Sequence, residues 1–244
     1  PTEFPLAAIA ARSVAGRALD QASRTMISVH GGTGATWEHD APLYFRRAQL
    51  SRRLLGGTAG AEGVTVEQVV RYDVTRALAH VTLDGARGTG LSTTGAITAD
   101  AWYVAQALLA AEAVGTVQTT LDLSVQYAKE RFTFGRAIGS YQSIKHELTE
   151  VLRRMENARS LLYYAGWART DAPDEFPLAA SAARSAAGGA LDFAARSVIN
   201  VHGGIGATWE HDAPLYFRRA QLTRRLVGGH GDATDRVAER LLAT

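Results

Sequence analysis

The chain has 244 residues with a formal net charge of +2, and 46% of its residues are apolar and 20% are charged. This composition is typical of a globular protein, and so small a net charge gives no reason to expect nucleic acid as a partner. The sequence has no cysteine for disulfides, thiolate catalysis or metal sites, and no apolar run of the roughly 20 residues that span a membrane, so we expect a cytoplasmic protein.

The first segment of the chain is a near copy of a later one. Residues 1–57 match residues 173–229 at a constant offset of 172, with 12 differences over the 57 positions. Solenoid repeats follow one another at short periods, so two distant copies indicate a duplicated or fused segment. Each copy predicts an Ala-rich helix, a Gly-rich turn and a second helix. Residues 1–60 are therefore predicted to be a duplicated helix-turn-helix half of a bundle.

Between the copies the sequence changes from strand-like to helical. Residues 64–84 are rich in β-branched side chains and predict two short strands, within a β segment that we place at 61–96. Gly115 lies in the middle of the long helix that follows, at a cost of about 1 kcal/mol relative to Ala, so we expect a neighbour to pack closely there. This helix runs from about Ala99 to Arg131 and has an apolar face formed by Val114, Val117, Leu121, Val125 and Ala128.

The remaining sequence predicts a helical bundle over residues 97–244. After the turn "TFGRAIGS", a second helix carries apolar residues at steps of three and four: Ile144, Leu148, Val151, Met155, Ala158, Leu162 and Ala165. After the short loop "RTDAPDEFP", a helix at 178–200 ends at "HGGIG", where Gly allows the chain to turn. Thr208 or Asp212 is expected to cap the next helix, which runs toward Leu226 until "GGHGD" ends it. The predicted fold is mainly α, a four-helix bundle with a small β segment.

Two stretches carry a family resemblance. "YAKERFTFGRAIGSYQSIKHELTEVLRRMENAR", together with "NVHGGIGATWE", closely resembles the C-terminal helical domain of the flavin-dependent acyl-CoA dehydrogenases. "YDVTRALAHVTLDGA" resembles the last strands of the middle β domain of that family. The resemblance covers residues 63–244, and residues 1–57 match it a second time.

The resemblance implies an activity, a cofactor and partners. Members of the family use FAD to oxidise an acyl-CoA thioester to the 2,3-enoyl-CoA, while a carboxylate removes the α-proton and the β-carbon gives hydride to the flavin. They pass the electrons to an electron-transfer flavoprotein and assemble through the helical domain. We therefore expect FAD as the cofactor, an acyl-CoA as the substrate, and a homo- or hetero-oligomer.

The Arg-x-x-Phe-Gly turn of this chain would contribute to the FAD site. By resemblance Arg131 would bind the FAD pyrophosphate, usually that of a neighbouring subunit, and a planar bidentate guanidinium suits this task. Phe134 and Gln142 would be cofactor neighbours, and Thr133 would add a hydroxyl contact. Without the resemblance, Arg131 would be interpreted as a solvated arginine at a helix end. Phe134 would be interpreted as a core residue and Gln142 as a surface amide.

The "HGGIG" turn would approach the ADP half of FAD through its backbone. His202, Gly203 and Gly204 lie in this turn, where glycine permits close approach and exposes amide donors. Asn200 stands where many relatives have Gln. The turn lacks the preceding strand and the spacing of a Rossmann fingerprint, and the alternative is a plain interhelical turn. The first copy repeats the pattern at His30, Gly31 and Gly32.

Neither usual position of the catalytic carboxylate holds one. Ungapped alignment places residues 227–229, Val-Gly-Gly, where many relatives have a Glu, and the first copy has Leu-Gly-Gly at 55–57. A second family position, in the long helix, holds Ala105. Asp232 and Glu210 are the nearest acidic candidates in sequence.

Two further clusters of charged residues could have a functional role. "WEHD" at 209–212 contains potential metal ligands, but adjacent helical residues point in different directions, and an acidic helix start is the better interpretation. The pairs Arg218–Arg219 and Arg224–Arg225 could face CoA phosphates or a partner subunit, against the alternative of a solvated, salt-bridged face.

The sequence therefore leads to an acyl-CoA dehydrogenase-like flavoprotein, present as an incomplete or rearranged chain. The alternative is a non-catalytic partner subunit, or a structural fragment, of a heteromeric acyl-CoA dehydrogenase. The absence of the usual catalytic carboxylate favours the partner subunit or fragment. The retained Arg131, Gln142 and glycines favour the flavoprotein.

Overall fold

The computed structural model describes residues 62–69, 73, 78–86 and 96–243. The chain divides into two compact units, residues 1–94 and 95–244, which we describe separately. The first repeat copy, with His30, Gly31 and Gly32, lies outside the described residues, so its predicted helix-turn-helix remains a prediction.

The described part of the first unit is a β-hairpin. Strands β1 (Val64–Val69) and β2 (Leu78–Leu83) pair antiparallel, with Val64 opposite Leu83 and Val66 opposite Val81. Alternating side chains on a strand lie on opposite faces, so these pairs place apolar residues on one face. The two strands expected from the β-branched sequence are confirmed.

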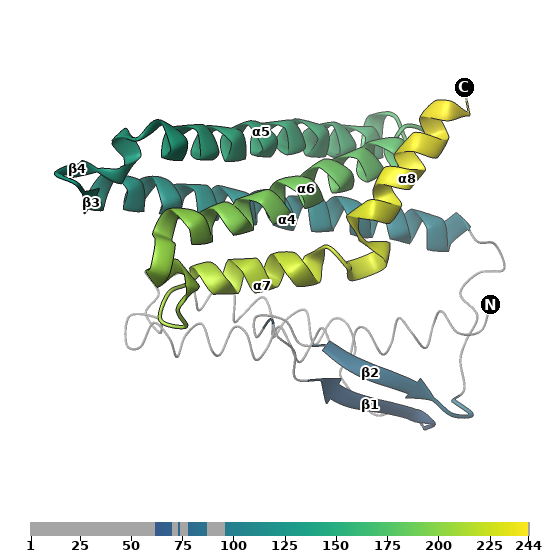
Figure 1. Ribbon diagram of the computed structural model, residues 1–244. Helices are drawn as coiled ribbons and strands as arrows, with labels where there is room; N and C mark the ends of the chain where they lie inside the picture. Colours follow the sequence, from purple (N-terminus) through teal and green to yellow (C-terminus); the bar gives the residue numbers. More distant parts are fainter. Residues whose placement is uncertain (1–61, 70–72, 74–77, 87–95, 244) are drawn as a thin grey trace, which may run out of the picture. The chain divides into compact units, whose positions relative to one another are not determined.

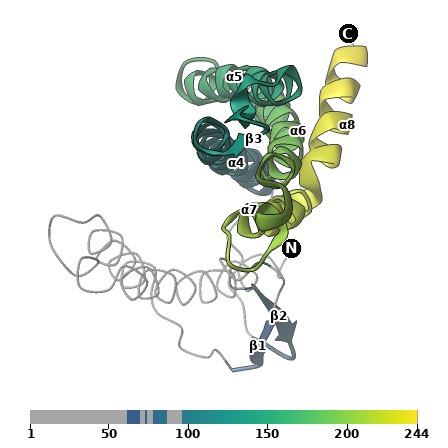
Figure 2. The same ribbon diagram turned by 60° about the vertical axis from the view of Figure 1, so that its left-hand side comes forward.

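The second unit is a helical bundle, as the sequence predicted. Its long helices are α4 (Ala96–Glu130), α5 (Gln142–Asp171) and α6 (Phe176–His202), and its shorter ones are α7 (Ala213–Thr223) and α8 (Gly229–Leu242). Figures 1 and 2 show α4, α5 and α6 side by side, with α7 below them and α8 crossing one end. A short hairpin of β3 (Phe132–Thr133) and β4 (Arg136–Ala137) joins α4 to α5.

Helix α6 forms the centre of the core. Sixteen of its 27 residues are buried, among them a long series of alanines that includes Ala183, Ala187 and Ala194. Alanine permits close helix approach and loses no side-chain entropy on burial. Residues of α4 and α5 complete the core around it, among them Val117, Leu121, Val151, Met155 and Ala158. The two apolar seams predicted for α4 and α5 are therefore confirmed.

The structure differs from three local predictions, in whole or in part. A side chain added at Gly115 would meet nothing within 4 Å, because this glycine lies on the exposed face of α4 and has no close neighbour in the bundle. Of the two residues expected to cap α7, Asp212 occupies the N-cap position, although without a side-chain hydrogen bond, whereas the Thr208 hydroxyl donates to the Ile205 carbonyl at 2.8 Å. α7 ends at Thr223, and "GGHGD" begins α8 instead of only ending a helix.

No helix in the described ranges is long and apolar enough to cross a membrane.

Candidate functional site

The hairpin between α4 and α5 exposes two aromatic side chains. Phe134 is 94% exposed and Phe132 is 64% exposed. Phe134 also has a φ of +52°, and Gly135 after it has a φ of +78°. A bulky residue in the left-handed region is an outlier that the surrounding structure must hold in place. The strain and the exposure together mark this turn as a functional candidate.

Contacts at the base of the hairpin fix its position. The Ile138 amide donates to the Arg131 carbonyl at 2.8 Å, and the Tyr141 hydroxyl donates to the Thr133 carbonyl at 3.1 Å. The Arg136 guanidinium lies over the Tyr141 ring, 4.0 Å from its centroid. The exposed Arg131 side chain thus projects from a backbone that is held on both sides.

The end of α6 is anchored by the ring of His202. This imidazole is 5% exposed and stacks on Tyr127 of α4, with 4.3 Å between ring centroids. Its Nδ1 lies 2.7 Å from the Val198 carbonyl, and since a carbonyl can only accept, Nδ1 is the donor. The His211 ring lies against His202 with centroids 4.4 Å apart. Burial lowers the pKa of His202, the hydrogen bond to Val198 opposes this, and charge on His211 lowers the pKa further.

The glycines that follow His202 have two different surroundings. An added side chain at Gly203 or Gly204 would meet nothing within 4 Å, and Gly203 has a φ of +62°. At Gly206, by contrast, the added Cβ would lie 2.7 Å from the His202 Cβ and 2.9 Å from the Ile199 carbonyl oxygen. Gly206 is therefore needed for packing, whereas Gly203 and Gly204 leave their backbone open to a ligand.

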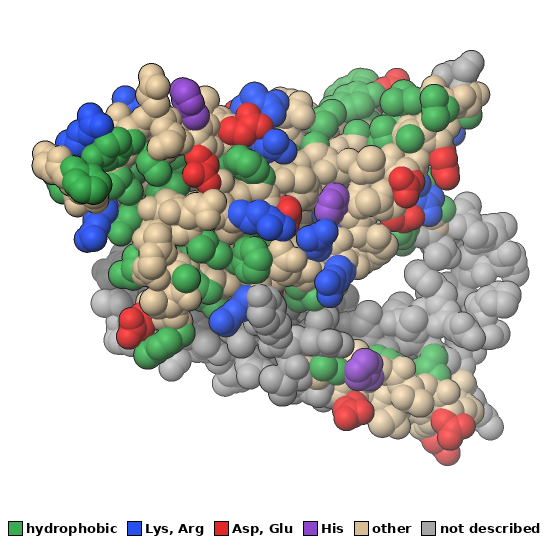
Figure 3. Space-filling model, viewed as in Figure 1, with side chains coloured by type: hydrophobic (Ala, Val, Ile, Leu, Met, Phe, Trp, Pro, Cys, Tyr) green, Lys and Arg blue, Asp and Glu red, His purple; other side chains and the backbone are tan. Residues whose placement is uncertain are grey.

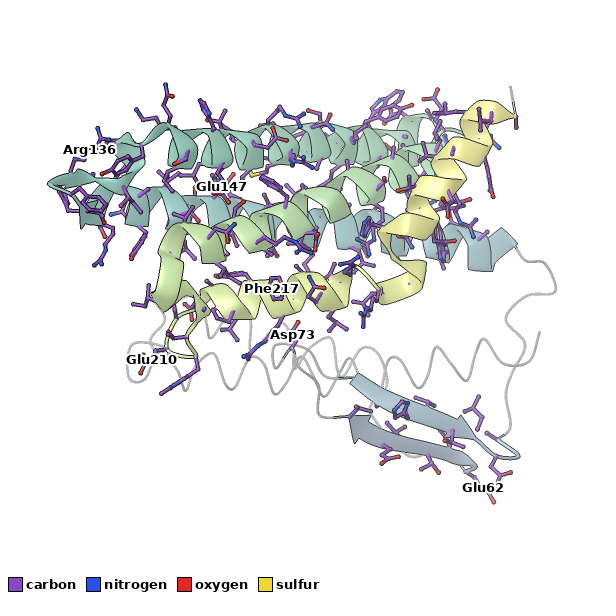
Figure 4. The ribbon with its side chains drawn as sticks, in the orientation of Figure 1. Glu62, Asp73, Arg136, Glu147, Glu210 and Phe217 are labelled. Carbon is purple, nitrogen blue, oxygen red and sulfur yellow. The ribbon has the colours of Figure 1, made fainter. Side chains whose placement is uncertain are left out.

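The predicted cofactor residues gather at one end of the bundle. Figures 1 and 2 show the end of α4, the β3–β4 hairpin, the start of α5 and the end of α6 together. The Asn200 amide of α6 donates to Glu147 of α5 at 3.3 Å, and Gln142 is the exposed first residue of α5. In Figure 4, Arg136 and Glu147 lie at this same end. Residues far apart in the sequence thus lie at the same end of the bundle.

The turn between α7 and α8 holds residues 227–229, where the family resemblance leads us to expect a catalytic carboxylate. Val227 has a φ of +52°, Gly228 of +81° and Gly229 of +82°. A Cβ on Gly228 would lie 2.7 Å from Oδ2 of Asp232. A glutamate at residue 228 would be strained by the left-handed backbone and repelled by this neighbouring carboxylate.

The two acidic candidates lie in different places. Asp232 is in the first turn of α8 and pairs with Arg236 at 3.5 Å. Glu210 is exposed in the turn before α7, toward the end of the bundle where the predicted cofactor residues lie (Figure 4). The 11 residues of α7 separate the two regions by roughly 16 Å at 1.5 Å per residue. Within the described ranges, no three His, Asp or Glu residues come together as a metal site.

Sequence reasoning missed a buried polar network at this turn. Arg184 of α6 is fully buried, and its Nε donates to Oε1 of Gln106 in α4 at 3.1 Å. Its second guanidinium nitrogen donates to the Thr223 carbonyl at 2.6 Å. Gln106 in turn donates to the Val227 carbonyl at 2.8 Å. The signal for this network in the sequence was Arg184 itself, because a charged residue within the Ala-rich stretch of 178–200 suggests a buried partner.

One arginine of each pair, in α7 and directly after it, lies beside an acidic side chain. Arg219 is 3.9 Å from Glu112 of α4, and Arg224 is 3.6 Å from Asp192 of α6. Figure 3 shows basic and acidic side chains interspersed over this face. The arrangement supports a salt-bridged surface.

Comparisons with known proteins agree with this fold. The family model described as acyl-CoA dehydrogenase, C-terminal domain, matches residues 97–242. The chain is 41% identical over 179 residues to acyl-CoA dehydrogenase FadE34 of Mycobacterium tuberculosis, covering 73% of this chain and 25% of that protein. It is 44% identical over 120 residues to acyl-CoA dehydrogenase IpdE2 of the same organism, covering 49% of this chain and 36% of that one.

A solved structure extends the match to the architecture. The ChsE4–ChsE5 complex from Mycobacterium tuberculosis aligns with a TM-score of 0.69 at 25% identity, covering 76% of this chain and 51% of the solved chain. The chain therefore spans only a quarter to about a half of the lengths of these relatives.

Proposed function

Because the chain belongs to the acyl-CoA dehydrogenase family, we propose that it supplies the C-terminal bundle of a flavin-dependent acyl-CoA dehydrogenase and binds the adenine–pyrophosphate half of FAD at one end of that bundle. The observation that carries the proposal is that the ends of α4, the β3–β4 hairpin, α5 and α6 that hold the cofactor candidates all lie at one end of the bundle.

The side chains at this end suit a dinucleotide. Arg131 would bind the pyrophosphate, because its guanidinium is exposed and offers planar paired donors. Phe134 would pack on the cofactor, which accounts for an aromatic ring that is almost fully exposed. Gln142 and Thr133 would add polar contacts from the start of α5 and from the hairpin.

The glycine turn would approach the ADP half with its backbone. Gly203 and Gly204 leave space around their amides, and Asn200 lies one turn before them on α6. The His202 ring holds the turn from inside the bundle, so its share in the site is to position the backbone.

The whole reaction would need more than this chain's described residues. Bound flavin would accept hydride from the β-carbon of an acyl-CoA, and an electron-transfer flavoprotein would then reoxidise it. The described residues would bind and orient the cofactor, and Asp232 and Glu210 are the acidic groups among which to search for a base.

The flavin content of the purified chain tests the proposal. We expect near-stoichiometric bound FAD in the visible absorption spectrum, and at least a tenfold weaker affinity in Arg131→Ala. Arg153→Ala is the matched control, because Arg153 is an exposed arginine of α5 whose ion pair with Glu150 is a surface contact of small energy. A folded chain that binds no flavin, or equal losses in both variants, would contradict the FAD site.

A second candidate function is that of a non-catalytic partner subunit. The left-handed backbone at Gly228 and the nearby Asp232 carboxylate disfavour a glutamate in the position where relatives have one. Position 105, the other family position, is an alanine. The structural neighbour ChsE4–ChsE5 is itself a complex of two different chains. Dehydrogenase activity that appears only when this chain is mixed with a complete relative would support the partner function, and activity of this chain alone would exclude it.

A further inference from the structure

The first turn of α8 packs on α6 through a half-buried histidine, His230. An added Cβ at Gly188 would lie 2.4 Å from the Cβ and 2.7 Å from the Cγ of His230, so α6 lacks a side chain where this imidazole sits. The Nδ1 of His230 is buried and, among the described residues, has no hydrogen-bond partner. A proton added to this ring would therefore place a charge against α6 at a nitrogen that is buried and has no acceptor beside it in the described residues.

The charges around His230 are mainly positive. Arg184 of α6 and Arg224 after α7 face it, and Asp192 of α6 is the acidic group. Asp192 is already shared, because Arg224 lies 3.6 Å and Arg196 3.3 Å from its carboxylate. Burial lowers the pKa of His230, the charges of Arg184 and Arg224 lower it further, and Asp192 opposes them. On its own helix, Asp232 pairs with Arg236.

Few residues of helix α8 are buried in the bundle. Only Gly229 and Ala233 of its 14 residues are buried, and Leu241 and Leu242 near its end are 61% and 85% exposed. The contacts that hold it on the bundle include a 2.6 Å hydrogen bond between Ser185 and Thr234 and the Arg236 guanidinium over the Trp102 ring. An element with so few buried contacts belongs to the part of a fold that opens first.

We propose that α8 is an acid-released latch, in which protonation of His230 beside Arg184 and Arg224 frees the first turn of α8 from Gly188 of α6. Opening would also free the 227–229 turn, because this turn connects α8 to the network of Gln106 and Arg184. The latch rests on the described residues of the helical unit and does not depend on flavin binding.

The sign of the pH dependence follows from the direction of the shift. The pKa of His230 is lower in the closed state than the ordinary value of about 6.5, so the closed state is fully favoured above that pH. As the pH falls below it, the opened state takes up a proton that the closed state resists. One proton increases the opening equilibrium by at most tenfold per pH unit, and the increase ends below the pKa of the closed state.

Amide hydrogen exchange of the full chain between pH 7.5 and 5 tests the latch. After correction for the intrinsic exchange rate, we expect the protection of residues 231–242 to fall below about pH 6.5 by up to tenfold per unit, while the middle of α5 stays protected. If α8 of the unmodified chain keeps the same protection throughout this range, the proposal is wrong.

Variants separate His230 from the other histidines. His230→Phe and His230→Gln remove the titration with different effects on packing, and in whichever of them folds α8 protection should no longer depend on pH. His146→Gln is the control, because His146 is exposed on α5, and it should behave like the unmodified chain. The same pH-dependent loss in a folded His230 variant would assign the effect to another group, such as the His202–His211 pair.

Discussion

Gly188 and Gly189 are neighbours in α6 with opposite surroundings. An added Cβ at Gly188 would overlap the His230 side chain at 2.4 Å, whereas at Gly189 it would meet nothing within 4 Å. We expect Gly188→Ala to destabilise the bundle by about 1–3 kcal/mol through overpacking. Gly189→Ala should stabilise it by up to about 1 kcal/mol, since alanine is the better helix former. Urea unfolding followed by circular dichroism measures both, and equal effects would contradict the close packing of α8 on α6.

At the same scale, the sequence could predict which residues were candidates but not all of their surroundings. The glycine-rich turn and Arg131 could be singled out because a motif is local in the chain. That the His202 ring is buried against Tyr127 depends on α4 and α6 meeting, which no local pattern contains. Gly115 was predicted to mark a close helix contact, but an added side chain there would meet nothing within 4 Å. A glycine in a helix therefore does not by itself indicate close packing.

At the scale of elements, one buried network links α4, α6 and the end of α7. Arg184 donates to Gln106 and to the Thr223 carbonyl, and both acceptors are buried residues. We expect Arg184→Met to cost about 1–3 kcal/mol, because the side chain volume remains but the acceptors lose a charged donor. Combined with Gln106→Leu, the loss should fall short of the sum of the two single losses by at least about 0.5 kcal/mol. Strictly additive free energies of unfolding would show that the two side chains do not act together.

The long helices could largely be predicted from the periodicity of their apolar residues. The seams of α4 and α5 follow steps of three and four residues, and these steps repeat because one face of a helix meets the core. α8 was missed because its sequence begins with glycines, which usually indicate a helix end. Here a buried network holds the Val227 carbonyl, and the glycines allow the left-handed turn into the new helix. The boundary was thus set by tertiary contacts that the local sequence does not contain.

At the scale of the whole molecule, the helical unit carries its own core. Among the described residues, every member of the buried apolar cluster lies in residues 95–244, which also form one of the two compact units. A unit of this size is expected to bury about 68–70% of its unfolded surface, enough for independent folding. We expect residues 95–244, expressed alone, to show helical circular dichroism and a single cooperative thermal transition. A broad transition without cooperativity would mean that residues 1–94 are needed for the packing of the bundle.

The alanine face of α6 limits how its sequence can diverge. Five of the 12 differences between the two copies fall at positions that are buried in the second copy, and at four of these the first copy has the larger residue: Ile9 for Ser181, Ser23 for Ala195, Thr25 for Ser197 and Met26 for Val198. Each larger side chain would have to be accommodated against the neighbours of α6, at the cost of overpacking a core. The two copies are therefore nearly identical in sequence, yet the first copy would not fit the place of α6 in this bundle without repacking of the core.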